Sequence, residues 1–195
     1  MSIVVQEQLK YENAFQQVLI NLATRFINVP VDQMDEAITD ALRQIVQFLG
    51  SMRSTINQLN EDKTEFIPVY QWAEVKSDRL SFGWTVIPEW DRYMPSLIRG
   101  DVIKVANLDD LPEDDGFRQF IANIGVSSIV IVPIIKQKDL IGFISTGWNR
   151  PQGIQSEIVG LLQVVGEIFQ KNQLRTSTVQ RNTLEDIDLG SLHVN

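Results

Sequence analysis

"IGVSSIVIVPIIKQKDLIGFIS", residues 124–145, is the segment of this chain that is most informative about its fold. A glycine leads into an apolar run rich in β-branched residues, the polar stretch "KQKD" follows, and a second apolar run completes it. Apolar runs of this length and composition are typical of strands, and a short polar stretch between them is typical of a turn. The sequence therefore predicts two apolar strands joined by a polar turn.

The segments before this pair also read as short elements. Residues 53–60 and 64–74 are β-like runs separated by "EDK", which predicts a hairpin. Residues 101–108 predict a short strand, and 111–125 begin with proline and acidic residues and end on glycine, the polarity of a short helix. The region 75–100 between them has no clear period and is predicted to be irregular.

Helical periodicity is confined to the two ends of the chain. Residues 5–28 carry an apolar stripe at three- and four-residue spacings, and Pro30 interrupts it. Asp32 is expected to cap a second helix that stops at Gly50, and residues 154–175 form the last predicted helix. The three stripes are Phe15, Val18, Leu19, Leu22 and Phe26; then Met34, Ile38, Leu42, Ile45 and Leu49; then Ile158, Leu161, Val165 and Ile168.

Helices at both ends and strands in the middle indicate the α+β class, with an antiparallel sheet and helices packed on one face. No composition shift or internal repeat marks a boundary, so residues 1–178 are predicted to form a single domain. Residues 179–195 are polar and without periodicity, and we expect them to be a mobile tail.

Composition restricts the classes of function. The chain has 195 residues, 44% of them hydrophobic, and a net charge of −8, which argues against nucleic acid as the main partner. It has neither a Lys/Arg-rich amphipathic face for an anionic membrane nor an apolar run long enough to cross one. No secretory signal is visible, and we expect a cytoplasmic protein.

The residues that carry most enzyme chemistry are scarce. There is no cysteine, which excludes disulfides, thiolate nucleophiles and Cys-ligated metals, and the one histidine, His193, lies in the expected tail. A Ser-His-Asp arrangement therefore lacks a positioned base. The acidic run of residues 109–116 fails the EF-hand template and reads as a solvated loop and helix start. A pair of catalytic carboxylates is left open but nothing places two together, so we predict that the chain is not an enzyme.

In order and spacing, these motifs resemble the GAF domain. The likeness covers residues 12–175 and is most specific in "IGVSSIVIVPI" followed by "LIGFIS". It implies a five- or six-stranded antiparallel sheet with terminal helices on one face. On the other face, the irregular segment and short helix roof a small-molecule pocket, a GAF/PAS-like layout.

The resemblance is closest to bacterial and phytochrome-like signalling GAF domains. It implies a sensory or regulatory role in a bacterial signal-transduction system such as a two-component system. The partner output would be a histidine kinase or a cyclic-di-GMP-synthesising domain. It also implies a homodimer, often parallel, formed through the terminal helices.

The ligand chemistry of known GAF domains does not carry over. Phe117 and Arg118 stand where bilin-binding members have an adjacent Cys-His pair, and Val86-Ile87-Pro88 matches their Asp-Ile-Pro. The family's haem-binding members need an axial histidine from the fold, and its sulfoxide-reducing members need cysteines. The resemblance therefore excludes covalent bilin, disfavours free bilin and haem, and leads us to expect no cofactor.

The aromatic stretch "SFGWTVIPEWDRYM", residues 81–94, would form the roof of the pocket. One hypothesis is that it walls a site for an apolar or planar ligand. The alternative is that the same side chains fill the space, which would leave an interaction or dimerisation scaffold without a ligand. The candidate lining residues are Trp72, Phe82, Trp84, Trp90, Tyr93 and Met94.

The last predicted helix has two interpretations. The stripe Ile158, Leu161, Val165 and Ile168, followed by Asn172, reads as a coiled-coil seam with a polar residue that sets the register. Packing against the protein's own sheet would give the same stripe. Leu162 and Phe169 add a second apolar flank, so we expect this helix to take part in a dimer interface.

Overall fold

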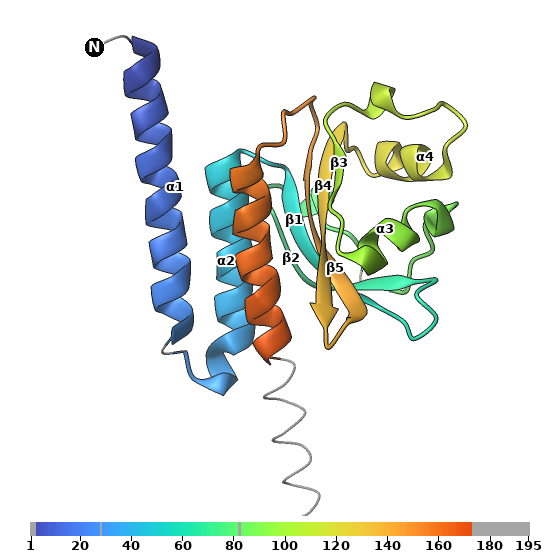
Figure 1. Ribbon diagram of the computed structural model, residues 1–195, viewed down its shortest axis with the longest axis horizontal. Coiled ribbons are helices and arrows are strands. Elements are labelled where there is room, and N and C mark those ends of the chain that lie inside the picture. Colours follow the sequence, from blue (N-terminus) through green and yellow to red (C-terminus); the bar gives the residue numbers. More distant parts are fainter. Residues whose placement is uncertain (1–2, 28, 82, 173–195) are drawn as a thin grey trace, which may run out of the picture.

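The computed structural model describes residues 3–27, 29–81 and 83–172, and it contains a five-stranded antiparallel sheet (Figure 1). The strand order is β2-β1-β5-β4-β3. The α+β class and the antiparallel sheet predicted from the sequence are confirmed. The expected tail, residues 179–195, and His193 lie outside the described residues. The strands are β1 (Arg53–Leu59), β2 (Phe66–Ala73), β3 (Ile103–Val105), β4 (Ser128–Lys136) and β5 (Asp139–Trp148).

The helices cover both faces of this sheet. The described helices are α1 (Ile3–Ile27), α2 (Met34–Leu49), α3 (Met94–Arg99), α4 (Gly116–Asn123) and a C-terminal helix over residues 156–172. Single turns of 3-10 helix lie at Val31–Gln33, Lys76–Asp78, Trp90–Arg92 and Leu108–Asp110. Helix α3 lies inside the segment predicted to be irregular, and it begins with a proline in its first turn.

Two residues, Asp32 and Gly50, are predicted from the sequence to begin and end α2. Gly50 ends α2 in the left-handed conformation with φ of 55°, as expected for a C-terminal glycine. The prediction that Asp32 caps α2 is wrong, because Asp32 lies within the 3-10 turn and Gln33 precedes the helix without a side-chain cap.

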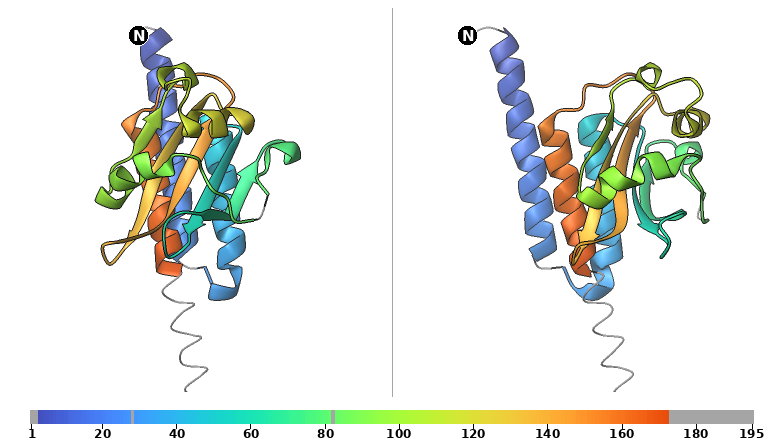
Figure 2. Two further views of the ribbon diagram at one scale, coloured as in Figure 1. Left: turned by 90° about the vertical axis from the view of Figure 1, so that its right-hand side faces the viewer. Right: turned by 45° about the vertical axis from the view of Figure 1, so that its right-hand side comes forward.

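The molecule is built in layers (Figure 1, Figure 2). Helix α2 and the C-terminal helix lie against one face of the sheet, and α1 packs outside them. On the other face lie the segment around α3 and the short helix α4. We call residues 86–99 the roof, and α4 lies beside it. The predicted arrangement, with terminal helices on one face and a roof on the other, is therefore what the structure has.

Strand β4 is apolar along most of its length because both of its faces are buried. Val130 and Val132 of β4 belong to the core on the helix side, whereas Ile129 and Ile131 belong to the core on the roof side. Strands β1 and β5 also approach closely, since a Cβ atom at Gly142 would lie 2.2 Å from the carbonyl oxygen of Asn57. The decisive stretch of sequence thus forms the wall between two hydrophobic cores.

Candidate functional site

Trp90 is the centre of the core beneath the roof. Its side chain is 4% exposed, and its indole ring lies 5.7 Å from the ring centroids of both Phe117 and Phe143. The ring of Tyr93 is 6.1 Å from Trp90 and 4.7 Å from Phe117. These separations are within the range in which aromatic rings attract each other. One aromatic cluster therefore joins the roof, helix α4 and strand β5.

Little empty space remains between the roof and the sheet. The cavity enclosed there measures about 30 Å³, room for roughly one water molecule. Phe66, Phe117, Phe120 and Phe143 contribute to its walls together with aliphatic residues. In this conformation the side chains of the protein itself fill the space beneath the roof.

A row of polar groups lies on the sheet beneath the roof. Asn57 Nδ2 donates to Thr55 Oγ1 over 2.8 Å, and Thr55 Oγ1 and Ser145 Oγ share a 2.8 Å hydrogen bond. Asn57 is 1% exposed, and its Oδ1 has no hydrogen-bond partner within the described residues. Asn57 and Ser145 both line the 30 Å³ cavity. A buried acceptor without a partner is costly and can be satisfied by a ligand or a water molecule.

Arg53 extends this polar row and connects two loops. Its Nη1 donates to the carbonyl oxygen of Asp78 over 2.7 Å, and its Nη2 donates to that of Ile124 over 3.0 Å. The side chain is buried, and this burial lowers the pKa of the Arg53 guanidinium, although the nearby Asp78 opposes the shift. Arg53 therefore links the segment after β2 to the turn after α4.

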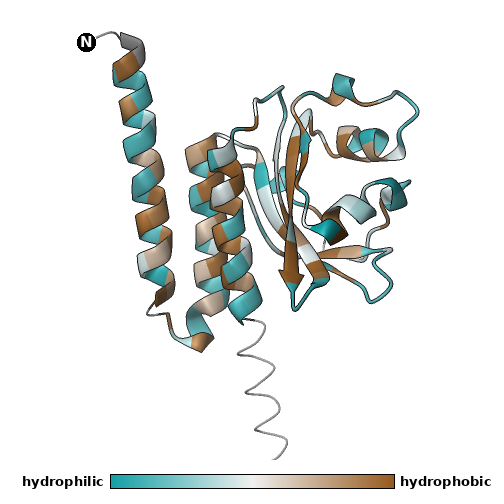
Figure 3. Ribbon diagram, viewed as in Figure 1, coloured by the Kyte–Doolittle hydropathy of each residue, from teal (hydrophilic) through white to brown (hydrophobic). Residues whose placement is uncertain are grey.

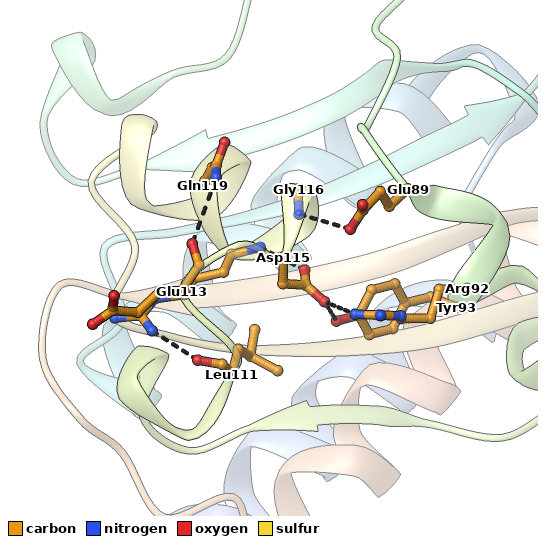
Figure 4. A network of polar contacts seen from close by, with 9 residues as sticks. Glu89, Arg92, Tyr93, Leu111, Glu113, Asp115, Gly116 and Gln119 are labelled. Carbon is orange, nitrogen blue, oxygen red and sulfur yellow. Dashed lines mark hydrogen bonds and ion pairs between the residues drawn. The ribbon is translucent and has the colours of Figure 1, made fainter.

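Asp115 holds the roof to the start of α4 (Figure 4). Its Oδ2 accepts hydrogen bonds from Arg92 Nη1 over 2.6 Å and from the Tyr93 hydroxyl over 2.8 Å. Its Oδ1 accepts from the amide of Arg118 over 3.0 Å and so caps the helix. The Asp115 side chain is fully buried. We call Asp115, Arg92 and Tyr93 the Asp115 latch.

The contacts of the Asp115 latch shift the pKa values of Asp115 and Tyr93. Burial by itself would raise the pKa of Asp115, but the hydrogen bonds from the Arg118 amide, Tyr93 and Arg92 together hold the pKa below its ordinary value. Burial, followed by the hydrogen bond to Asp115, raises the pKa of Tyr93 to about 12. The latch is therefore assembled with an ionised carboxylate and a neutral phenol.

A second contact joins the roof to α4 beside the latch. The Gly116 amide donates to Glu89 Oε2 over 3.0 Å, and Glu89 itself adopts a left-handed backbone with φ of 56°. A Cβ atom at Gly116 would lie 2.7 Å from the Cβ of Pro88, closer than two such atoms can pack. Only glycine allows the roof and the helix to approach this closely.

The predicted lining residues separate into three groups. Trp90, Tyr93 and Met94 come together in the roof-side core, although their role in ligand binding stays a prediction. Trp84 is 53% exposed, and Trp72 packs against the core on the opposite, helix-side face of the sheet. The structure therefore does not place Trp84 and Trp72 at the site. Phe82 lies outside the described residues.

The sequence does not indicate the roles that four residues have in this site: Asn57, Asp115, Phe117 and Phe143. It points to Phe117 only as the replacement of a cysteine and not as a residue that fills space. Residues 109–116 are predicted to be a solvated loop and a helix start, and Asp115 does cap α4, yet its side chain is fully buried. Its position directly before an apolar helix was the available signal, because such a residue often caps.

The expected dimer residues of the C-terminal helix are used within the chain itself. Ile158, Leu161 and Val165 are buried in the helix-side core, and Ile168 packs against the same core. Asn172, at the next position, is 8% exposed. Within the chain, this stripe packs in the helix-side core, which is the second of the two interpretations, and a dimer through this helix stays a prediction.

The described residues contain no group of three or more His, Cys, Asp or Glu side chains that could hold a metal ion. Within the same part of the chain, none of the helices combines the length and apolarity needed to cross a membrane.

Comparisons with known proteins agree with this architecture. A family model described as "GAF domain" matches residues 33–170. No match was found among curated proteins.

Several solved structures are similar in fold. A phycoerythrobilin-bound GAF domain from a cyanobacterial phytochrome is 16% identical, with a TM-score of 0.67 over 83% of this chain and 97% of that one. The blue-light absorbing form of the Thermosynechococcus elongatus PixJ GAF domain is 10% identical, with a TM-score of 0.63 over 80% and 96%. The chromophore-binding domain of a bacteriophytochrome from R. palustris is 16% identical, with a TM-score of 0.64 over 91% and 63%. At these identities the likeness concerns the fold.

Proposed function

Because this chain belongs to the GAF domain family, we propose that it is a non-catalytic sensory and regulatory module of a bacterial signal-transduction system. A small molecule or a partner acts on the roof, and the sheet passes the change to the terminal helices. The module works as a homodimer upstream of a histidine kinase or a cyclic-di-GMP-synthesising output.

The observation that carries this proposal is a closed roof held by a few identifiable contacts. The enclosed space is about 30 Å³, and the roof meets α4 through the Asp115 latch and the bond from Gly116 to Glu89. A ligand larger than water enters only if the roof moves. Such a ligand therefore selects an open conformation, and the free energy of opening reduces its apparent affinity.

The polar row suggests the kind of ligand. Asn57 Oδ1 is an acceptor without a partner among the described residues, and Ser145 and Arg53 line the same cavity. A small molecule with a hydrogen-bond donor and an apolar body matches this surface, because aromatic side chains face the polar row. We do not propose a bilin, although the phycoerythrobilin-bound relative shares the fold, because Phe117 and Trp90 occupy the space beneath the roof.

A ligand screen on two matched variants tests the proposal. Asp115→Asn keeps an acceptor for the helix cap but removes the carboxylate that binds Arg92 and Tyr93. Asp101→Asn makes the same substitution in an exposed ion pair with Arg99 and serves as the control. A ligand that needs an open roof should bind Asp115→Asn more tightly, about tenfold for each 1.4 kcal/mol of opening cost removed. Binding is measured as the rise in melting temperature with metabolite concentration.

The filled core also favours a second candidate, an interaction and dimerisation scaffold that binds no ligand. Its support is the aromatic cluster of Trp90, Phe117 and Phe143, which occupies the site where a ligand would bind. If no metabolite stabilises the wild-type chain or Asp115→Asn, the scaffold is the correct function. If a metabolite stabilises Asp115→Asn more than wild type and Asp101→Asn, the sensory function is correct.

A further inference from the structure

The roof carries apolar side chains on its exposed surface as well as beneath it. Val86 is 59% exposed, Ile98 is 48% exposed, and Trp84, two positions before Val86, is 53% exposed. Figure 3 shows the hydrophilic tip of the hairpin between β1 and β2 beside this part of the roof. A groove of about 390 Å³ lies there, which we call the outer groove. Residues 62–64 of the hairpin tip line one side of it, and Val86 and Ile98 are among the roof residues that line the other.

The roof side of the outer groove is a preformed apolar surface. Pro88 and Pro95 line it, and a proline side chain has almost no conformational freedom to lose when a partner covers it. Trp90 and Met94 also line it, and both are already buried in the roof-side core. Docking in this groove therefore orders few side chains, which keeps the entropic cost of binding low.

The rim of the outer groove is acidic. Asp62, Glu89 and Asp91 line it, against a single cation, Lys63. The Nζ atom of Lys63 already lies 3.0 Å from Oδ1 of Asp139, in an ion pair. Asp62 and Asp91 are exposed, and neither has an ion pair within the described part of the chain. The groove thus presents two uncompensated carboxylates.

The cations of the roof do not compensate these carboxylates. Arg92 is bound to Asp115 in the latch, with 2.6 Å between Nη1 and Oδ2. Arg99 pairs with Asp101, with 2.8 Å between Nη2 and Oδ2. Both arginines of the roof therefore have a carboxylate of their own, and the electrostatic field at the outer groove is negative.

This charge decides between the possible occupants of the groove. A second copy would bring one acidic rim against another, and an anionic membrane or a nucleic acid would be repelled in the same way. A cationic partner instead gains ion pairs with Asp62 and Asp91. Its apolar side chains can cover Val86 and Ile98, and the exposed ring of Trp84 offers a further cation a favourable contact.

We propose that the outer groove docks a cationic amphipathic segment of another protein, with apolar side chains on Val86 and Ile98 and Lys or Arg side chains on Asp62 and Asp91. In the proposed function, on which this inference rests, the segment is the partner that acts on the roof. Because it contacts the hairpin tip and the roof together, it stabilises the closed roof. It therefore weakens the binding of any ligand that needs an open roof.

Two matched peptides test the docking. The probes are a fluorescein-labelled amphipathic peptide of leucine and lysine and its counterpart with glutamate in place of lysine, followed by fluorescence anisotropy at about 0.15 M salt. We expect saturable binding of the lysine peptide alone. Asp62→Asn with Asp91→Asn should weaken it about 2- to 30-fold, the range for two exposed ion pairs. Asp32→Asn with Asp110→Asn removes the same net charge from exposed residues that do not line the groove, and should leave binding unchanged.

A second pair of variants tests the apolar part of the groove. Val86→Ser and Val75→Ser make the same change at side chains that are 59% and 55% exposed, and of the two only Val86 lines the groove. Val86→Ser should weaken binding of the lysine peptide about fourfold for each buried CH₂-sized group that is lost. Val75→Ser should bind like wild type. All of these substitutions replace exposed side chains, so the fold seen by circular dichroism should persist.

Three results would overturn the proposal. Equal weakening in the groove and control variants would mean that the peptide responds to the net charge of −8 and not to this site. Spermine binding as tightly as the peptide would mean that charge alone is recognised. A wild type that binds no peptide, whether a second copy or its own residues 173–195 cover the groove, would also contradict it. The ligand screen in wild type and Asp115→Asn does not use this groove, so the docking proposal and the proposed function fail separately.

Discussion

Replacing Trp90 by alanine tests whether the protein's own side chains fill the space beneath the roof. Truncating a buried Trp to Ala costs about 3–5 kcal/mol, and Trp90 is 4% exposed and touches three aromatic rings. The loss of a buried unsatisfied donor offsets part of this cost. The indole Nε1 is buried without a hydrogen-bond partner among the described residues, and its removal in Trp90→Ala stabilises the folded state by about 1 kcal/mol or more. We therefore expect Trp90→Ala to lose about 3 kcal/mol of unfolding free energy.

The assay is urea unfolding followed by far-UV circular dichroism at one fixed protein concentration. With a slope of about 1–3 kcal/mol per molar urea, the midpoint should fall by about 1–3 M. Trp84→Ala is the matched control, because that side chain is 53% exposed and its loss should change stability by less than about 0.5 kcal/mol.

Adding indole should reverse part of the loss in Trp90→Ala. The substitution leaves a hole of indole shape, and a ligand at 100 times its Kd adds about 2.7 kcal/mol. Trp84→Ala should not respond. A loss of less than about 1 kcal/mol in Trp90→Ala, or an equal loss in Trp84→Ala, would show that Trp90 does not fill the space beneath the roof.

Four further predictions concern the latch and the contact beside it. Tyr93→Phe removes the hydroxyl that donates to Asp115, and we expect urea unfolding to show a loss of about 1.5–3 kcal/mol. Gly116→Ala pushes a methyl group into Pro88 and should cost about 1–3 kcal/mol, whereas Gly153→Ala meets nothing within 4 Å and should be nearly neutral. At alkaline pH, the pKa of Tyr93 is about 12 in the folded protein, whereas the phenol in the unfolded chain ionises near pH 10. The free energy of unfolding should therefore fall between about pH 10 and pH 12, and it should fall less in Tyr93→Phe. At acid pH, the lowered pKa of Asp115 means that the stabilisation from its carboxylate is lost as the pH drops below about 3.9. In Asp115→Asn, the free energy of unfolding should therefore depend less on pH in this range.

The sheet and the helices could be predicted because each depends on local periodicity. The pattern of residues 124–145 predicts two strands, which the structure contains. The predicted stripe of α1 that begins at Phe15 packs against the helix-side core. Which side chains of the roof are buried could not be predicted, because their burial depends on the chain direction after a left-handed residue at Glu89. Trp84 and Trp90 lie six residues apart in one aromatic segment, yet one is exposed and the other is buried.

The stripe of the C-terminal helix shows a second feature that periodicity in the sequence does not predict, namely which surface an apolar helix face packs against. An apolar face on Ile158, Leu161 and Val165 is equally suited to the chain's own sheet and to a partner helix. Only the position of α2 and the sheet shows that this face is already covered. Likewise, Asp115 could be expected to cap a helix, but its contacts with Arg92 and Tyr93 join residues more than twenty positions apart.

The most direct test of a roof that opens as a unit is hydrogen exchange at the Gly116 amide, which donates to Glu89 across the junction of roof and α4. In the wild-type protein we predict that this amide exchanges at a lower opening free energy than the amides of Val130 and Ile144 in the central strands. In Asp115→Asn, the exchange of the Gly116 amide should accelerate. The opening free energies of the two strand amides, measured relative to the free energy of global unfolding, should not change. If Gly116 exchanges only with the free energy of global unfolding in both proteins, the roof does not open separately and the account is contradicted.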